Sequence, residues 1–418
     1  MSVGRTADEH GTAAPGTQAG SRGAREAADA GADAATDTRR ALARVNVAAI
    51  ERNVAHIRGQ LGDGCGLCAV VKADGYGHGA LQSAHAALGG GAMMLAVAGA
   101  REAVELRAAG FAGVPLLVMG ALSAVELGEA LRADAEVVLW SEAGVRAVAA
   151  AGGGRVHVKL DSGMGRLGTR DRDEARRVVE LAAATPGVEL AGAMTHFATA
   201  DDRSDDGFFE RQLDVFAQWA AALKAEHPTA LVHAANSAAT LREPSSHFDM
   251  VRCGIAIYGM DPFGADPLSV GLEPALELSS YVAEVKRCAP GESAGYGRRF
   301  VAERETQLGV VPIGYGDGWR RGLSDNADVL VAGRRRALVG TVSMDNLTVD
   351  LDADPAAHEL RGAEAVLIGA SGSERILAEE VARRLDTINY EVTCALTQRV
   401  PRLHHRDGSP TAGSAALW

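Results

Sequence analysis

An alternation of short apolar segments with longer amphipathic ones begins at Leu42 and restricts the fold more than any other feature of the chain. Eight of the apolar segments have the length and composition of strands: 69–72, 95–98, 115–119, 136–140, 157–160, 190–195, 231–235 and 251–258. Helical spacing of apolar residues precedes or separates them at 48–61, 101–109, 173–184 and 210–226. Eight strand–helix units over about 200 residues predict a (β/α)8 TIM-type barrel of the α/β class. The rival is a doubly wound open sheet, which is disfavoured because the first strand–helix turn lacks the Rossmann phosphate signature.

The second half of the chain has a different pattern, and 418 residues are many for a single core. After residue 272, strand-like segments joined by short turns occur at 276–286, 306–312, 329–342 and 347–351, with one helix at 378–385. Ala332 and Gly333 predict a hairpin turn inside the third of these. We therefore predict a barrel over residues 39–272 and a mostly-β C-terminal domain over residues 273–418.

The first 38 residues contain no leucine, isoleucine or aromatic residue. Such a segment cannot bury enough apolar surface to fold, so we expect residues 1–38 to be a disordered extension. It also lacks the apolar region of a secretory signal.

Composition excludes several classes of partner. A net charge of -12 gives no basic surface for nucleic acid, and no apolar run has the length of a membrane span. The five cysteines are scattered and odd in number, which is typical of a reducing, cytoplasmic compartment rather than of a disulfide framework. Cys65 and Cys68 form a C-x-x-C, but without a second pair we expect buried small residues and no metal site.

Lys72 is the first residue with a chemical signature, in the stretch V-V-K-A-D-G-Y-G-H-G at 70–79. It stands at the end of an apolar strand, where desolvation can remove its proton and make it a nucleophile. An isolated lysine at a strand end more often only reaches for solvent. A neutral lysine amine, however, forms a Schiff base with an aldehyde such as that of pyridoxal phosphate.

Other reactive residue types also fall at the predicted strand ends, where barrels of this kind carry their functional residues. They are Lys159 and Asp161, His196, the group His233, Asn236 and Ser237, and Arg252. Phosphate sites in such barrels commonly use the loops after strands seven and eight. Ser237 opens a helical segment after the seventh strand, and we place Gly254 and Ile255 in the eighth, where a glycine permits close backbone approach. This arrangement favours a phosphorylated cofactor.

Several segments resemble the alanine racemase family. The stretch at 70–79 is similar to the family's cofactor-lysine segment, and the other matching segments are V-K-L-D-S-G-M-G-R-L-G at 158–168, H-A-A-N-S-A-A at 233–239, R-C-G-I-A-I-Y-G at 252–259, G-Y-G-D-G-W at 314–319, S-M-D at 343–345, N-Y-E at 389–391 and R-V-P-R at 399–402. The resemblance covers residues 42–403. It implies a pyridoxal phosphate-dependent isomerase that interconverts L- and D-alanine, supplies D-alanine for the peptidoglycan of the cell wall, and acts as a cytoplasmic homodimer.

The resemblance also assigns roles to residues. The implied catalytic bases are Lys72 and Tyr296, the latter delivered from the partner subunit. The cofactor would be held by Lys72, Tyr76, His196, Ser237, Arg252, Gly254, Ile255 and Tyr390, with Arg252 facing the pyridine nitrogen. The substrate carboxylate would bind Arg166 and the backbone of Met344, and Lys159, His233 and Asp345 would support the site. In the family the lysine at 159 can be carbamylated, which makes it an anion that orients the arginine.

The chemistry of two of these residues can be argued from their groups. The Arg252 guanidinium has only donors, so it disfavours a protonated pyridine nitrogen and weakens the ring as an electron sink. This favours racemisation over transamination or decarboxylation. A phenol such as Tyr296 is a poor base unless cations stabilise its phenolate, and Arg252 and His196 are candidates for that task.

Departures from the family leave substrate breadth open. Ser343 stands where many members have cysteine, Arg320 adds a charge beside Arg321, and S-A-G-Y-G around Tyr296 is looser than the usual S-Y-G. A racemase of broader specificity, for serine or other small amino acids, is therefore an alternative. A barrel-type amino acid decarboxylase with the same cofactor is a weaker one, because it usually has an acidic group at the pyridine nitrogen. A pyridoxal phosphate carrier is disfavoured because carriers of that kind are single barrels.

Overall fold

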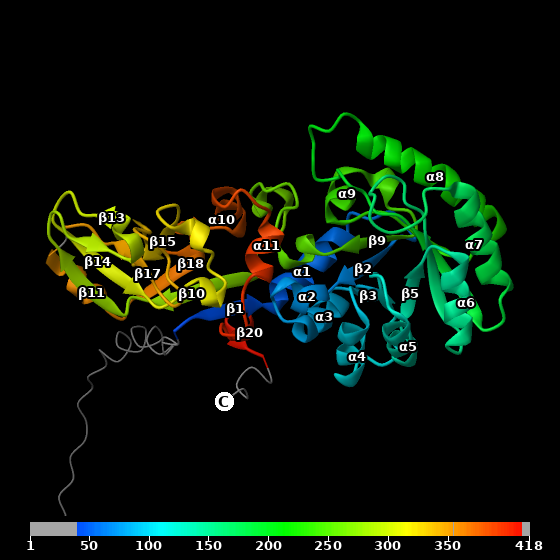
Figure 1. Cartoon of the computed structure of the whole chain (residues 1–418), viewed down its shortest axis with the longest axis horizontal. Helices are drawn as coiled ribbons and strands as arrows, with labels where there is room; N and C mark the ends of the chain where they lie inside the picture. Colours follow the sequence, from blue (N-terminus) through cyan, green and yellow to red (C-terminus); the bar gives the residue numbers. More distant parts are fainter. Residues whose placement is uncertain (1–39, 354, 412–418) are drawn as a thin grey trace, which may run out of the picture. The chain divides into compact units, whose positions relative to one another are not determined.

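The computed structural model describes residues 40–353 and 355–411, so the predicted disordered extension over 1–38 lies outside the described residues. A sheet of eight parallel strands forms a nearly closed barrel in the order β8-β7-β6-β5-β4-β3-β2-β9 (Figure 1). Its strands are β2 (Gly66–Val70), β3 (Met94–Val97), β4 (Leu116–Val118), β5 (Glu136–Leu139), β6 (Gly154–Lys159), β7 (Val188–Met194), β8 (Leu231–His233) and β9 (Met250–Cys253). The predicted (β/α)8 barrel is confirmed.

Helices connect the barrel strands, as parallel strands require. They include α3 (Ala80–Gly89), α4 (Ala100–Ala108), α5 (Ala124–Arg132), α6 (Glu142–Ala150), α7 (Arg172–Ala184), α8 (Phe208–Glu226) and α9 (Ser237–Arg242), and a further helix, α1 (Val47–Arg58), precedes the first barrel strand. Helix α7 illustrates how the sequence produces them. The Asp171 side chain accepts hydrogen bonds from the first-turn N–H groups of α7, while Ala175, Val178 and Ala182 form its buried face.

Several predicted strands run past the observed carboxyl ends, and two of these differences affect the site. The eighth strand ends at Cys253, and the predicted continuation to 258 is instead a 3-10 helix, η2 (Ile255–Tyr258). Gly254 therefore lies between the strand and η2, and Ile255 is the first residue of η2. The segment is fully buried, and an apolar run alone does not distinguish a buried strand from a buried helical turn. Likewise β2 ends at Val70, and Lys72 begins the short helix α2 (Lys72–Tyr76) rather than ending the strand.

The C-terminal part is mostly β, as predicted. Its largest sheet has the order β16-β15-β18-β10-β1-β20-β21, and the strands of that path are β1 (Leu42–Asn46), β10 (Leu276–Tyr281), β15 (Asp328–Val331), β16 (Arg334–Ala337), β18 (Glu364–Ser371), β20 (Arg402–Arg406) and β21 (Ser409–Pro410). The β15–β16 pair turns at Ala332 and Gly333, as predicted. Strand β1 precedes the barrel in sequence, yet it pairs with β10 and β20, so this sheet takes a strand from the region expected to form only barrel.

Smaller sheets and two helices complete the C-terminal part. A three-stranded sheet has the order β11-β14-β17, made of β11 (Glu284–Cys288), β14 (Thr306–Val311) and β17 (Leu347–Asp350). The predicted continuous segment 276–286 is thus divided between β10 and β11, in two different sheets. Helix α10 (Ala378–Arg384) matches the predicted helix, and α11 (Asn389–Cys394) was not predicted.

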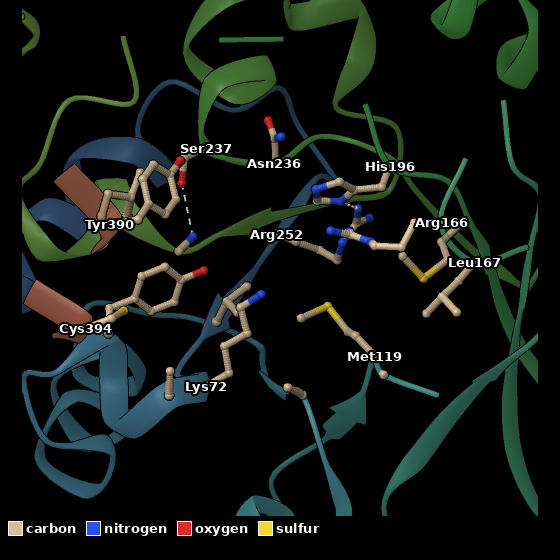
Figure 2. Close-up of a pocket in the computed structure, with 18 of the residues that line it drawn as sticks. Lys72, Met119, Arg166, Leu167, His196, Asn236, Ser237, Arg252, Tyr390 and Cys394 are labelled. Atoms are coloured by element: carbon tan, nitrogen blue, oxygen red, sulfur yellow. Dashed lines mark hydrogen bonds between the residues drawn. The ribbon is translucent and has the colours of Figure 1, made fainter. Parts of the chain in front are cut away.

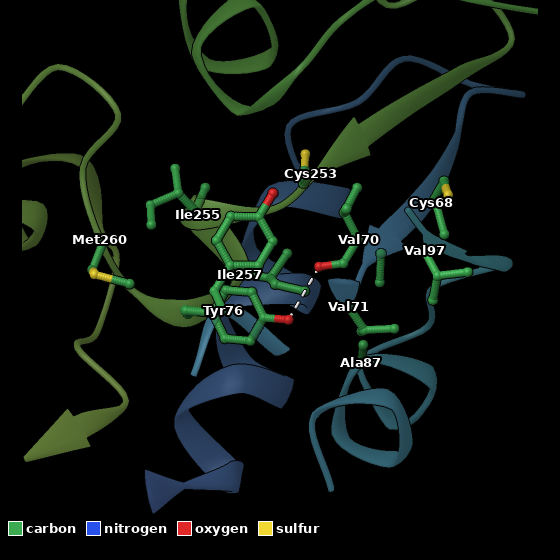
Figure 3. Packing of buried hydrophobic residues seen from close by; sticks show 14 of the residues in the cluster. Cys68, Val70, Val71, Tyr76, Ala87, Val97, Cys253, Ile255, Ile257 and Met260 are labelled. Carbon is green, nitrogen blue, oxygen red and sulfur yellow. Dashed lines mark hydrogen bonds between the residues drawn. The ribbon is translucent and has the colours of Figure 1, made fainter. Parts of the chain in front are cut away.

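A dense apolar cluster supports the start of α2, where Lys72 lies. Figure 3 shows Val70, Tyr76 and Ile257 packed together at the end of β2. The Tyr258 hydroxyl donates a hydrogen bond to the Val70 carbonyl at 3.1 Å, and the Tyr76 and Tyr258 rings are 5.2 Å apart. The rigid support of this segment keeps Lys72 in one place. No helix in the described part of the chain has both the length and the apolar content to cross a bilayer.

Candidate active site

A cavity of ≈ 520 Å³ lies at the carboxyl ends of the barrel strands and brings together most of the predicted site residues (Figure 2). Those that line it are Lys72, Tyr76, Lys159, Arg166, His196, Ser237, Arg252, Gly254, Ile255 and Tyr390. Four of these residues are lysine or arginine, and none of the described residues that line the cavity is aspartate or glutamate. Such a cavity selects anionic ligands, because every unpaired cation in it gains from a negative partner.

Lys72 enters the cavity from a strained turn. Ala73, Asp74 and Tyr76 have φ angles between 52° and 54°, in the left-handed region that side chains other than glycine rarely adopt. Two carboxylates hold the turn: Glu102 accepts a hydrogen bond from the Ala73 N–H at 2.7 Å, and Asp74 accepts one from the Ala80 N–H at 2.9 Å. Burial, followed by the nearby Arg166 guanidinium, lowers the pKa of Lys72, which favours its nucleophilic neutral form.

One corner of the cavity is formed by Ser237, Gly254 and the phenols of Tyr76 and Tyr390, which are packed closely together. Ser237 Oγ accepts hydrogen bonds from the N–H groups of Gly254 at 3.0 Å and Ala256 at 3.3 Å. A Cβ added at Gly254 would lie 2.3 Å from the Tyr76 hydroxyl oxygen, so only glycine allows that hydroxyl so close to the backbone. Burial raises the pKa of Tyr76 and of Tyr390, and both phenols therefore keep their protons as donors.

Arg252 also lines the cavity, and it is 2% exposed. Its Nη2 donates to the Thr195 and Ala234 carbonyls at 2.8 and 2.9 Å and to His196 Nδ1 at 3.2 Å. Its Nη1 donates to His233 Nδ1 at 2.8 Å. Burial lowers the pKa of Arg252 to about 10, so the guanidinium remains charged near neutral pH. Its Nε, by contrast, is buried and has no partner in the described chain, which leaves one donor for a ligand.

Lys159 and His196 share the cationic side of the cavity. Burial, then the charges of Arg252 and Arg166, lower the pKa of Lys159 to about 8. Burial, then the charges of Arg252 and Lys159, lower the pKa of His196 well below its usual value, so this imidazole is neutral. A neutral His196 accepts at Nδ1 from Arg252, which agrees with the 3.2 Å hydrogen bond.

Four predicted residues lie outside this cavity. Tyr296 and Met344 are 73% and 51% exposed, and Asp345 is paired with Arg399 at 2.5 Å. The Thr341 hydroxyl donates to the Tyr296 carbonyl at 2.8 Å, and the Gly316 N–H donates to the Met344 carbonyl at 2.9 Å. His233 is fully buried behind Arg252 and does not line the cavity.

Some lining residues were not among those predicted from the sequence. Met119 directly follows β4 and Leu167 follows Arg166, but apolar side chains at strand ends carry no chemical signal. Cys394 reaches the cavity from α11, a helix that the sequence did not predict.

Asn236 was selected from the sequence because it follows a predicted strand, and it lines the cavity. Its side chain caps α9 by accepting a hydrogen bond from the Ala239 N–H at 3.0 Å.

The fold and the cavity together define a two-domain barrel protein with a lysine-containing, cationic site at the carboxyl ends of its strands. Two family models match almost the whole of the described chain: "Alanine racemase, N-terminal domain" over residues 45–262 and "Alanine racemase, C-terminal domain" over residues 275–404. The chain belongs to the alanine racemase family.

Individual relatives agree over most of their length. Alanine racemase 1 of Bacillus subtilis is 39% identical over 373 residues, which cover 88% of this chain and 93% of the relative. Alanine racemase of Geobacillus stearothermophilus is 41% identical over 370 residues, covering 87% and 93%. The crystal structure of alanine racemase from Bacillus anthracis with bound L-Ala-P has a TM-score of 0.80 at 36% identity and covers 89% of this chain and 97% of that one. Alanine racemase from Streptomyces coelicolor A3(2) likewise has a TM-score of 0.80, at 37% identity, with coverage of 87% and 98%.

Proposed function

We propose that this protein is a pyridoxal phosphate-dependent alanine racemase that interconverts L- and D-alanine in the cytoplasm and so supplies D-alanine for peptidoglycan. The observation that carries the proposal is the position of Lys72, whose pKa is lowered, in a cavity with cations and no carboxylate among its described lining residues. Family membership over both domains supports the same reaction. It also disfavours the decarboxylase and carrier alternatives, while a racemase with additional activity toward serine remains compatible with the site.

The residues present fit the cofactor at both of its ends. The Ser237 hydroxyl and the phenols of Tyr76 and Tyr390 provide donors for a phosphate, and Gly254 and Ile255 line the same corner of the cavity. The unpartnered Nε of Arg252 provides a donor for a pyridine nitrogen, which is an acceptor when unprotonated. When bound, pyridoxal phosphate would join the substrate's amino group covalently and withdraw electrons from its α-carbon.

Racemisation requires one base on each face of the α-carbon. Lys72 Nζ would remove or return the proton on one face, since its lowered pKa makes the neutral amine available. Tyr296 would serve the other face from a partner subunit, because this residue is 73% exposed on its own chain and does not line that chain's cavity. The active enzyme would therefore be a homodimer with shared sites, and the exposed Met344 would reach the partner's site in the same way.

The substrate carboxylate would bind Arg166, whose planar guanidinium suits a bidentate contact. Lys159 would be carbamylated: its neutral amine adds to carbon dioxide and releases one proton, which leaves an anion at a position where the protonated amine would be a cation. A pKa of about 8 makes this reaction accessible near neutral pH. The anion would offset the charges of Arg166 and Arg252 and orient Arg166 toward substrate.

The deciding experiment is proton NMR of L-alanine with the cofactor-loaded protein in deuterated water, together with a chiral assay. Loss of the α-proton signal with appearance of D-alanine is the expected result. Exchange without inversion would leave only one working base and would contradict the role of Tyr296. The Lys72→Ala variant serves as the control, since it should lose the absorbance band of covalently bound cofactor and all exchange. Exchange with serine and not alanine would replace the substrate in this proposal.

A further inference from the structure

Behind Arg252, a line of buried polar groups crosses the barrel interior. Arg252 Nη1 lies 2.8 Å from His233 Nδ1, His233 Nε2 lies 2.8 Å from His157 Nδ1, and His157 Nε2 lies 2.6 Å from Glu136 Oε2. Both imidazoles are fully buried and Glu136 is 6% exposed. The line begins at the cavity and ends on β5, where Arg155 forms an ion pair with Glu136 Oε1 at 3.3 Å.

The barrel is built around this line. A Cβ added at Gly192 of β7 would lie 2.4 Å from His157 Nδ1, so a glycine makes the space that the imidazole fills. The pairing of β6 with β7 also shifts register between Val156 and His157. Interiors of such barrels are usually filled by branched apolar side chains, and two histidines and a carboxylate are an unusual filling.

The donor at one end, Arg252, and the acceptor at the other, Glu136, fix every proton in between. Arginine only donates, so His233 must accept at Nδ1. Burial, then the charge of Arg252, lowers the pKa of His233 well below its usual value, so this ring is neutral and carries its proton on Nε2. Nε2–H then donates to His157 Nδ1, which leaves the His157 proton on Nε2, facing Glu136.

Glu136, at the other end of this line, carries a negative charge. Burial acts to raise the pKa of Glu136, but His157, which donates to Oε2 at 2.6 Å, and then Arg155, which pairs with Oε1 at 3.3 Å, outweigh it, and the net pKa is lowered. Glu136 is therefore a carboxylate that only accepts. A second proton on either imidazole would place two donors face to face, so the four groups have one consistent proton order.

We propose that Glu136 and His157 are positioning residues that act through His233 to hold Arg252 Nη1 as a donor into the barrel, which keeps Arg252 Nε turned toward the cofactor ring. Because the Nη2 group is already bound to two carbonyls and His196, the contact at Nη1 completes the fixation of the guanidinium plane. The contact of Arg252 Nε with the cofactor ring rests on the proposed function, whereas the order of protons from Arg252 to Glu136 does not.

The proton order is tested first, by nitrogen NMR of the cofactor-loaded enzyme with its histidines labelled with nitrogen-15. Long-range correlations distinguish a proton on Nε2 from one on Nδ1 and from a doubly protonated ring, and the signals of His157 are assigned by their absence in His157→Asn. The expected result is Nε2–H on both His157 and His233. A doubly protonated ring or an Nδ1–H form at either position would overturn the proposal.

Three variants then test the positioning role. Glu136→Gln keeps an acceptor and should change kcat less than about threefold, whereas Glu136→Leu removes it and should lower kcat at least about tenfold, as is usual when a partner that orients a binding side chain is lost. Glu136→Leu should also change the absorption spectrum of the bound cofactor, whereas His233 keeps its proton on Nε2 for as long as Arg252 donates to its Nδ1. The matched control is Asp134→Asn, which removes the other carboxylate bound by Arg155, at 2.8 Å, and should change none of these.

These experiments distinguish a failure of the positioning role from a failure of the proposed function. An unchanged spectrum and an unchanged kcat in Glu136→Leu would overturn the positioning role and leave the racemase proposal intact. A wild-type protein that does not racemise alanine would contradict the proposed function without affecting the tautomers. If Glu136→Leu does not fold, Glu136→Met also lacks an acceptor and takes its place, and the wild-type spectrum still decides the proton order.

Discussion

The hydroxyl of Tyr76 lies against the backbone of Gly254, so closely that a methyl group on Gly254 would be 2.3 Å from it. These two residues come from opposite ends of the barrel sequence, after β2 and after β9, which are neighbours in the sheet. Their approach closes the donor corner that we assign to the phosphate. The absence of a side chain at Gly254 is therefore as important to this corner as the donors themselves.

Gly254→Ala should weaken cofactor binding, because the new methyl group must displace the Tyr76 hydroxyl or the Gly254 N–H. We expect the dissociation constant for pyridoxal phosphate to rise at least about tenfold, or about 1.4 kcal/mol. Fluorescence or absorbance titration of the cofactor-free protein measures it. Gly62→Ala is the control, since a Cβ there meets nothing within 4 Å. Equal affinities of the two variants would place the phosphate elsewhere.

Mixing two inactive variants should restore activity if Tyr296 serves the partner's site. Lys72→Ala lacks the lysine base and Tyr296→Phe lacks the phenol, so each homodimer should be inactive while still dimeric. In a mixed dimer, the site with Lys72 receives Tyr296 from the other subunit and is complete. Random exchange of subunits should restore about a quarter of wild-type activity, since half of the dimers are mixed and each has one intact site. No recovery in a verified mixed dimer would contradict the shared site.

Lys159 should take up carbon dioxide in a pH-dependent manner. Its lowered pKa, about 8, means that the neutral amine becomes the main form as the pH rises through that value. With carbon-13 bicarbonate, a carbamate carbon signal should be stronger at about pH 8.5 than at about pH 6.5. The Lys159→Met variant should lack it at both values. A signal that persists in that variant would come from another amine.

The same lysine should affect stability with a defined sign. Between its folded-state pKa of about 8 and the ordinary value of 10.5, the unfolded chain binds more protons at Lys159 than the folded one. Its contribution to the free energy of unfolding therefore rises with pH in this window, and it is most unfavourable below pH 8. In carbon dioxide-free buffer, Lys159→Met should flatten that rise in denaturant titrations. An unchanged pH dependence would show that Lys159 does not carry the shift.

Arg166→Ala should lower kcat/KM by an amount equivalent to about 2–5 kcal/mol, because a charge-assisted contact to the substrate carboxylate is lost. Cofactor binding should be retained, which an absorbance spectrum verifies. Arg172→Ala is the control, since Arg172 is exposed on α7, donates a hydrogen bond to Gln218 and does not line the cavity. If both variants keep wild-type kcat/KM, the carboxylate is bound by another group.

Much of the architecture was predictable because it depends on local patterns. The apolar runs that became β2 to β9 could be read one by one, and their number and order implied the barrel. Lys72, Lys159, His196 and Ser237 could be selected because polar, reactive side chains follow those runs. The errors fell where an apolar run continued past the end of its strand, as at Ile255, because burial alone does not decide between strand and helical turn.

By itself, the sequence determined the alternation of strands and helices, the change to a mostly-β C-terminal part, and which reactive residues follow which strands. Only the tertiary structure decided that β1 pairs with β10 and β20, that Tyr76 meets Gly254, that Arg252 Nε is left without a partner, and that Glu136 connects to it through two histidines. The reason is physical. Periodicity and turn chemistry act between residues near each other in the chain, whereas these contacts join distant residues and arise from how the elements pack.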